Sequence, residues 1–215
     1  MKSVELSDWI RNWYPANAAS LSLRHKLYDV GVNDADYVTS PRIDGKQLVC
    51  PAVSCWRGLI ERAYCEKLHA GHPTYKDVTV CDDWHYFMNF RRWWCENVID
   101  GYHLDKDLLV PGNKEYSPNA CVFVPQWLNS FTTDKGRDRG LYPIGCYSVK
   151  GRFMSRCSNP VSLKREFLGY FDSPDDASDA WRKRKLQIAA EIKHIIDEID
   201  TRIYQGLVEK ICSAA

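Results

Sequence analysis

The chain has 215 residues, of which 45% are hydrophobic and 13% aromatic, and its formal net charge is +1. This composition excludes a disordered chain, and the near-zero charge excludes a chain that is basic throughout and binds nucleic acid by charge alone. No run approaches the roughly 18 apolar residues of a membrane span, and the N-terminal "MKSVELSDWIRNWY" lacks the apolar core of a signal peptide. We therefore expect a globular cytoplasmic protein with no membrane partner.

Residues 1–48 are expected to form a helical and extended N-terminal arm. The stretch "SVELSDWIRNWY" predicts a helix that is capped by Ser3 or Ser7, and the polar turns "GVNDADY" and "PRIDG" follow it. The arm contains no catalytic pattern, so we expect it to dock or pack against the rest of the chain.

Residues 49–132 form an aromatic-rich central region with two predicted helices. Apolar residues recur at helical spacing in "CWRGLIERAYCEKLH" and again in "CDDWHYFMNFRRWWCENV". A buried core is the simplest interpretation of the second stripe, and stacking on nucleic-acid bases is the alternative. The stripe comprises Trp84, Phe87, Phe90, Trp93 and Trp94.

The nine cysteines are expected to be reduced thiols, because no secretion signal precedes them. No pair has the C-x-x-C spacing that most strongly indicates zinc, and buried apolar thiols are the favoured interpretation. A zinc site built from the central region remains an alternative. Its ligands would come from Cys50, Cys65, Cys81, His69 and His72.

A polar stretch, "GYHLDKDLLVPGNKEYSPNACVFVPQWLNSF", occupies residues 101–131. A turn explains its Pro, Gly and Asn, and Asp105 and Asp107 would then cap the turn and pair with Lys106 or Lys114. The alternative is a metal site, because His103 and two carboxylates lie within five residues of one another.

After a polar linker at residues 133–141, apolar and polar residues alternate with the period of two that is typical of β-strands. Three strands are predicted in "IGCYSV", "RFMSRC" and "REFLGYF", with a turn at Lys150 and Gly151. Residues 142–173 hold five basic and two acidic side chains, a local charge of +3. Alternation along the second strand separates Phe153, Ser155 and Cys157 on one face from Arg152, Met154 and Arg156 on the other.

The basic face of this sheet is a candidate for double-stranded DNA binding, since a small antiparallel sheet can enter the major groove. Arginines would reach base edges and lysines would reach phosphates; a merely solvated face is the alternative. The candidate DNA-binding residues are Tyr147, Lys150, Arg152, Met154, Arg156, Lys164 and Arg165.

A closing helix of about 38 residues is predicted after Ser173, which is its expected N-cap. Its first half would pack on the sheet. Its isoleucine-rich second half would pack on the central region or on another chain, as a homodimer or with a host protein. The basic run "RKRK" at 182–185 is either a solvated helix face or a phosphate contact.

Two blocks resemble known families. The block from "GVNDADY" through "CPAVSCWRGLIERAYC", "LDKDLL", "GNKEYSP" and "CVFVPQWLN" resembles a phage-encoded HNH-type family whose members are often classed as endonucleases. The block "LYPIGCYSVKGRFMSRC" with "REFLGYFDSPDDASDAW" is similar to an integrase-like, Apetala-type DNA-binding domain. The resemblance implies an α+β fold: an HNH-like ββα-metal region at 49–132, then a three-stranded antiparallel sheet packed on a long C-terminal helix at 142–213.

An HNH centre hydrolyses phosphodiester bonds with one general base and one divalent ion. The resemblance makes His103 the base and Asp105 and Asn129 the ligands of Mg²⁺ or Mn²⁺. Tyr102 stands where HNH sites usually carry Asp or His before this histidine.

Three functions therefore stay open. The first is a metal-dependent, homing-like HNH endonuclease in the cytoplasm of a bacterial host cell. The second is a catalytically degenerate DNA-binding or host-interaction protein on the same fold. The third is a protein–protein module that uses the isoleucine-faced helix.

Overall fold

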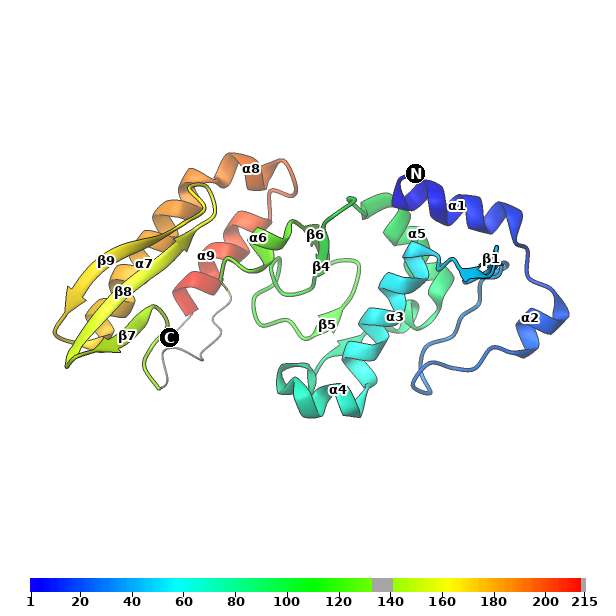
Figure 1. Cartoon of the computed structure of the whole chain (residues 1–215), viewed down its shortest axis with the longest axis horizontal. Coiled ribbons are helices and arrows are strands. Elements are labelled where there is room, and N and C mark those ends of the chain that lie inside the picture. Colours follow the sequence, from blue (N-terminus) through cyan, green and yellow to red (C-terminus); the bar gives the residue numbers. More distant parts are fainter. Residues whose placement is uncertain (133–140, 214–215) are drawn as a thin grey trace. The chain divides into compact units, whose positions relative to one another are not determined.

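The computed structural model describes residues 1–132 and 141–213 (Figure 1). The expected linker at 133–141 lies, except for its last residue, outside the described residues. The chain divides into two compact units, and each is described by itself. Unit 1 comprises residues 1–102 and 113–123, and unit 2 comprises residues 103–112 and 124–132 with 141–213.

Unit 1 is mainly helical, with short strand pairs and two 3₁₀ turns at Pro73–Tyr75 and Asp82–His85. β1 pairs with β2 antiparallel, and β3 pairs with β5 in parallel. Its elements are α1 (Ser3–Trp13), α2 (Ala18–Ser22), β1 (Arg42–Ile43), β2 (Lys46–Gln47), α3 (Pro51–Tyr64), α4 (Glu66–Gly71), β3 (Thr79–Val80), α5 (Phe87–Asn97) and β5 (Glu115–Tyr116).

The core of unit 1 is the aromatic stripe that the sequence predicts. Trp84, Phe87, Phe90 and Trp94 are at most 2% exposed, so these four rings pack in the interior and base stacking by them is excluded. Trp93 is half-buried and stacks on Phe123, with ring centroids 5.8 Å apart.

The expected arm packs in the same unit as α3 and α5. Lys2 takes the N-cap position of α1, so neither Ser3 nor Ser7 caps the helix. The Ser7 hydroxyl is buried, 3.2 Å from the Cys50 thiol. Arg91 of α5 is also buried, because it forms an ion pair with Asp8 of α1. Arg91 is therefore no candidate for a phosphate contact.

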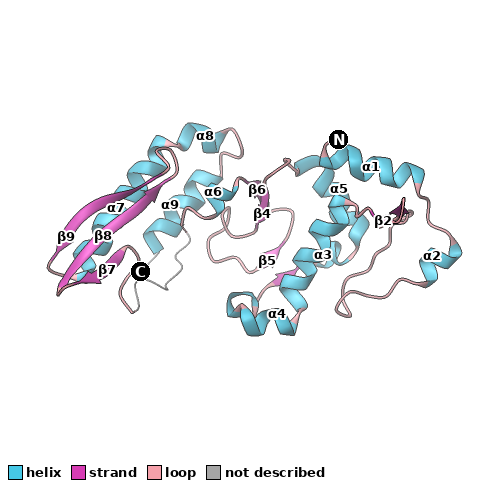
Figure 2. Cartoon of the chain, viewed as in Figure 1, coloured by secondary structure: helices cyan, strands magenta, loops and turns pink. Residues whose placement is uncertain are grey.

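Unit 2 is built on the three-stranded antiparallel sheet β7–β8–β9 (Figure 2). The predicted sheet and the α+β fold class are confirmed. The other elements of the unit are helices and one short strand, and β6 lies where the chain passes between the units. The bounds are β4 (His103–Asp105), β6 (Val122–Val124), α6 (Gln126–Asn129), β7 (Cys146–Val149), β8 (Arg152–Asn159), β9 (Lys164–Phe171), α7 (Pro174–Glu191), α8 (Lys193–Asp197) and α9 (Ile203–Ser213).

The turn between β7 and β8 has the left-handed backbone that two-residue hairpins require, with φ of 49° at Lys150 and 82° at Gly151. The register shifts once, because Ser155 pairs with Gly169 but Arg156 pairs with Phe167. Leu168 is thus the extra residue of a β-bulge.

α7 packs on one face of the sheet, with Ala177, Trp181 and Ile188 buried. The predicted cap is confirmed: the Ser173 hydroxyl accepts a hydrogen bond from the Asp176 N–H at 3.1 Å. Gly145 lies against Trp181, where an added Cβ would stand 2.3 Å from the ring's Cγ.

The prediction of one long closing helix is wrong, because α7, α8 and α9 are separate helices. α7 ends at Glu191, and the carboxylate of Asp200 accepts the Arg202 N–H at 2.9 Å in the turn before α9. α9 packs back against α7 and buries its apolar residues within unit 2. The buried residues of α8 and α9 include Ile196, Ile203, Leu207 and Ile211.

All nine cysteines are free thiols, and Cys50, Cys121, Cys146 and Cys157 are buried. In the part of the chain that the structure describes, no helix is long and apolar enough to span a membrane.

Candidate functional site

The face of the sheet turned away from α7 is the candidate site, and we call it the outer face. Cross-strand pairing defines it, since directly opposed residues share a face. Tyr147 pairs with Met154, Met154 with Tyr170, and Arg156 with Phe167. The outer face comprises Tyr147, Val149, Arg152, Met154, Arg156, Ser158, Arg165, Phe167 and Tyr170.

The predicted alternation along β8 is confirmed. Ser155 and Cys157 are buried beneath α7, and Phe153 packs on Tyr142 with ring centroids 5.3 Å apart. Arg152 is exposed, and Arg156 is half-buried on the other side of the strand.

Arg156 lies at the centre of the outer face. Its guanidinium stands 4.4 Å from the centroid of the Tyr147 ring, and its Nε has no hydrogen-bond partner. No carboxylate of the described residues forms an ion pair with it. The stacked ring holds the guanidinium in place. Its Nε is buried, so the terminal Nη groups are the donors that stay available to an acceptor from outside.

The two other arginines of this face are exposed. Arg152 lies 5.5 Å from the centroid of Tyr170, and its contact with Asp172 is 3.8 Å long between two largely exposed side chains. Such an exposed ion pair contributes little to stability, so Arg152 can readily leave Asp172 for another acceptor. Arg165 pairs across the sheet with Ser158.

Phe167 and Tyr170 add an apolar area that the sequence analysis missed. They are 60% and 47% exposed, and their ring centroids are 5.4 Å apart in an edge-to-face arrangement. Strict alternation fails in β9 because of the bulge at Leu168. The signal for it is Gly169, since a glycine inside a strand often marks a bulge.

The two predicted lysines lie at the margins of the sheet. Lys150 is in the exposed β7–β8 turn. Lys164 pairs with Asn159 at the start of β9, which places it on the α7 side, opposite the outer face. The structure therefore brings Lys164 together with Asn159 and not with Arg152 and Arg156.

Glu166, Arg184 and Lys185 on the α7 side have hydrogen-bond partners within the protein. Glu166 accepts hydrogen bonds from Arg184 at 2.6 Å and from Asn159 at 2.6 Å, and these bonds lower its pKa to about 2. Lys185 is buried and donates to the carbonyls of Phe131 and Ser158. Burial lowers the pKa of Lys185 to about 8. The "RKRK" run is thus partly structural and is not a solvated face.

Residues 105–108 of the polar stretch form a capped turn in unit 2. The Asp105 carboxylate is buried, and its Oδ1 accepts the backbone N–H groups of Asp107 at 2.9 Å and Leu108 at 2.7 Å. Burial, with the neighbouring charge of Asp107, raises the pKa of Asp105. Lys210 of α9 donates to Asp107 at 2.8 Å. Although burial opposes the change, this bond lowers the pKa of Asp107.

α9 approaches this turn very closely. At Gly206 an added Cβ would stand 1.8 Å from the Leu108 carbonyl oxygen. Together with the Lys210–Asp107 pair, this contact packs α9 against the turn. The polar-turn interpretation therefore accounts for both aspartates.

The residues of the expected metal centre lie in β4 and α6. His103 is exposed at the start of β4, and Asn129 is the half-buried last residue of α6. β4 and β6 pair and precede α6, which gives the strand–strand–helix order. One oxygen of Asp105, Oδ1, is engaged by the N–H groups of Asp107 and Leu108. Across residues 1–132 and 141–213, His, Cys, Asp and Glu form no group of three or more that could hold a metal ion.

No family model, no curated protein and no solved structure matches this chain.

Proposed function

We propose that the chain binds double-stranded DNA through the outer face of the β7–β9 sheet. The observation that carries the proposal is Arg156, which is stacked on Tyr147 at 4.4 Å in the middle of the face and has no carboxylate partner among the described residues. An arginine held in this way can donate two parallel hydrogen bonds to a guanine edge or a phosphate.

The dimensions of the sheet support the proposal. Three strands at about 4.8 Å spacing are roughly 10 Å wide, and the major groove of B-DNA is about 12 Å wide. Arg152 and Arg165 are then placed to contact base edges or the backbone, and Lys150 in its turn is placed to contact a phosphate. Phe167 and Tyr170 supply apolar contacts to sugars and thymine methyl groups.

The experiment measures fluorescence anisotropy of a labelled random-sequence duplex at several salt concentrations. Each neutralised phosphate releases counterions, so the logarithm of the affinity should fall linearly with the logarithm of salt concentration, with a slope of about −0.9 per phosphate. Arginine and lysine contacts to a few phosphates predict a clearly negative slope. An affinity for the duplex that salt does not change would contradict contacts to phosphates.

Strand cleavage is not part of this proposal, which rests on the outer face alone; at the expected cleavage centre, Oδ1 of Asp105 accepts two backbone N–H groups of its turn. The same preparation is incubated with supercoiled plasmid and Mg²⁺ or Mn²⁺. The proposal predicts retarded and uncut plasmid. Nicking that stops with EDTA and is lost in His103→Ala would instead establish the endonuclease.

A further inference from the structure

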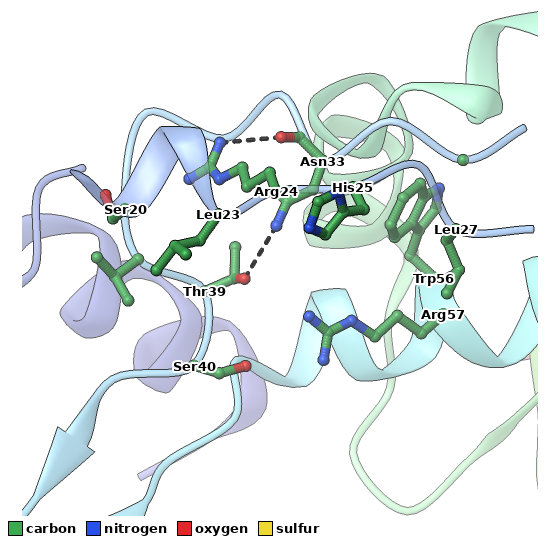
Figure 3. A pocket seen from close by; sticks show the side chains of 12 residues that line it. Ser20, Leu23, Arg24, His25, Leu27, Asn33, Thr39, Ser40, Trp56 and Arg57 are labelled. Carbon is green, nitrogen blue, oxygen red and sulfur yellow. Dashed lines mark hydrogen bonds between the residues drawn. The ribbon is translucent and has the colours of Figure 1, made fainter. Parts of the chain in front are cut away.

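A pocket of about 390 Å³ lies in unit 1 between α2, the loop of residues 23–40 and α3 (Figure 3). We call it the α2–α3 pocket. Arg24 fixes the shape of the loop, because its guanidinium donates to the carbonyls of Asn33, Ala35 and Tyr37 at 2.7–2.9 Å. The wall is thus held by partly buried hydrogen bonds within the protein.

Two side-chain acceptors in this wall are already used, while the Ser40 hydroxyl is not. The Asn33 carbonyl oxygen Oδ1 accepts the Ala35 N–H at 3.3 Å, and the Thr39 hydroxyl accepts from Asn33 Nδ2 at 3.1 Å. The hydroxyl of Ser40 is buried and has no hydrogen-bond partner. A buried hydroxyl without a partner is costly, so an acceptor in the pocket would stabilise it.

The pocket also has an excess of positive charge. Arg57 of α3 lines it without an ion pair among the described residues, and no acidic side chain lines the pocket. Figure 3 shows the Arg57 guanidinium directed into the space between Thr39, Ser40 and His25. Because the pocket is lined by an unpaired arginine and by no acidic side chain, its charge favours an anion.

The remaining lining is apolar. The ring of Trp56 closes the inner side, and Leu23, which is 77% exposed, stands at the rim. A volume near 390 Å³ lies within the range of sites for small organic ligands. The space therefore suits a molecule with an anionic end and an apolar body.

We propose that the α2–α3 pocket binds the phosphate group of a small phosphate monoester, with the body of the ester lying against Leu23 and Trp56. Phosphate offers three acceptor oxygens, which match the fork of Arg57 together with the hydroxyl of Ser40. The proposal is independent of DNA binding, because it uses only residues of unit 1.

Isothermal titration calorimetry at low ionic strength tests the pocket with inorganic phosphate, adenosine 5′-monophosphate and adenosine. The parent protein should bind phosphate, bind the monophosphate more tightly, and bind adenosine more weakly than either. Arg57→Gln should weaken the binding of both anions at least tenfold, and Ser40→Ala should weaken it several-fold. Arg92→Gln, which removes an exposed charge on α5 outside the pocket, should bind like the parent.

Lack of phosphate binding by the parent, or equal binding by Arg57→Gln, would overturn the proposal. A monophosphate that binds no better than phosphate would overturn the apolar part of it. DNA affinity is measured on Arg57→Gln in parallel and should equal that of the parent. The two proposals therefore fail separately.

Discussion

Arg156 and Glu166 belong to neighbouring strands but lie on opposite faces of the sheet, and their partners differ accordingly. Glu166 faces α7 and is held by Arg184 and Asn159, whereas Arg156 faces outward and has only the ring of Tyr147 beside it. The pleat of the sheet separates the charges in this way. Glu166 is satisfied inside unit 2, whereas Arg156 on the outer face has no carboxylate partner among the described residues.

Glu166 should make the stability of unit 2 depend on pH. Its pKa is about 2 in the folded protein, below its ordinary value of 4.5. A lowered carboxyl pKa stabilises the fold above the unfolded value, and this contribution is lost as the pH falls from about 4.5 toward 2. The difference in unfolding free energy between the parent and Glu166→Gln should therefore shrink over this interval.

Urea titrations at several pH values between 3 and 6 measure this difference. Asp172→Asn is the control, because its carboxylate is 97% exposed. If the difference in unfolding free energy between the parent and Glu166→Gln stays constant with pH, the ion pair with Arg184 does not lower the pKa of Glu166.

Replacing Gly145 by alanine should destabilise the protein more than the same replacement at Gly151. Both Gly145 and Gly151 have φ of 82°, but only Gly145 has Trp181 at 2.3 Å from its virtual Cβ. Alanine at either position costs roughly 1–2 kcal/mol for the left-handed backbone, and the clash at Gly145 adds about 1–3 kcal/mol.

Thermal unfolding of Gly145→Ala and Gly151→Ala compares the two sites. Equal losses of stability would mean that the contact with Trp181 does not limit this position.

At the scale of elements, α9 is positioned by a turn far away in the sequence. Lys210 binds Asp107, which lies 103 residues earlier, and Gly206 lets the helix approach the Leu108 carbonyl. The turn and the helix therefore fold as one feature, and the polar residues of the turn serve the packing of unit 2.

Gly206→Ala should destabilise the protein although alanine favours helices. The helix propensity gain of up to about 1 kcal/mol is outweighed by a Cβ placed 1.8 Å from a backbone oxygen. Gly58→Ala in α3 is the matched control, because its nearest neighbour is the end of Arg62 at 3.6 Å. It should be neutral or stabilising in denaturant titrations. A stabilised Gly206→Ala would contradict the packing of α9 on the turn.

Local patterns predicted the sheet and its faces well, because alternation along β8 and the turn at Lys150 and Gly151 depend on near neighbours alone. They did not predict the break after Glu191, since the apolar period continues through Ile192, Ile196 and Ile203 as if one helix ran on. The role of Asp105 was equally out of reach. Asp105 caps a turn in which Asp107 accepts a hydrogen bond from Lys210 of α9, and α9 is distant in the sequence.

At the scale of the whole molecule, the net charge of +1 conceals an uneven distribution. Many arginines and lysines are paired with acids within their own unit, including Arg11, Arg91, Arg184 and Lys210. Arg156 on the outer face and Arg57 in the α2–α3 pocket have no such pair among the described residues. A near-neutral chain can therefore bind two different anions at two local surfaces.

The central claim is that the outer face binds DNA, and one comparison tests it most directly. Anisotropy of a labelled duplex is measured with the parent, Arg156→Ala and Lys183→Gln. Lys183 is exposed on α7, so both variants lose one positive charge of unit 2 but only one of them alters the outer face. We predict that Arg156→Ala loses roughly 1–3 kcal/mol of binding free energy and that Lys183→Gln binds nearly as well as the parent. Equal affinities for the two variants, or no binding by the parent, would contradict the claim.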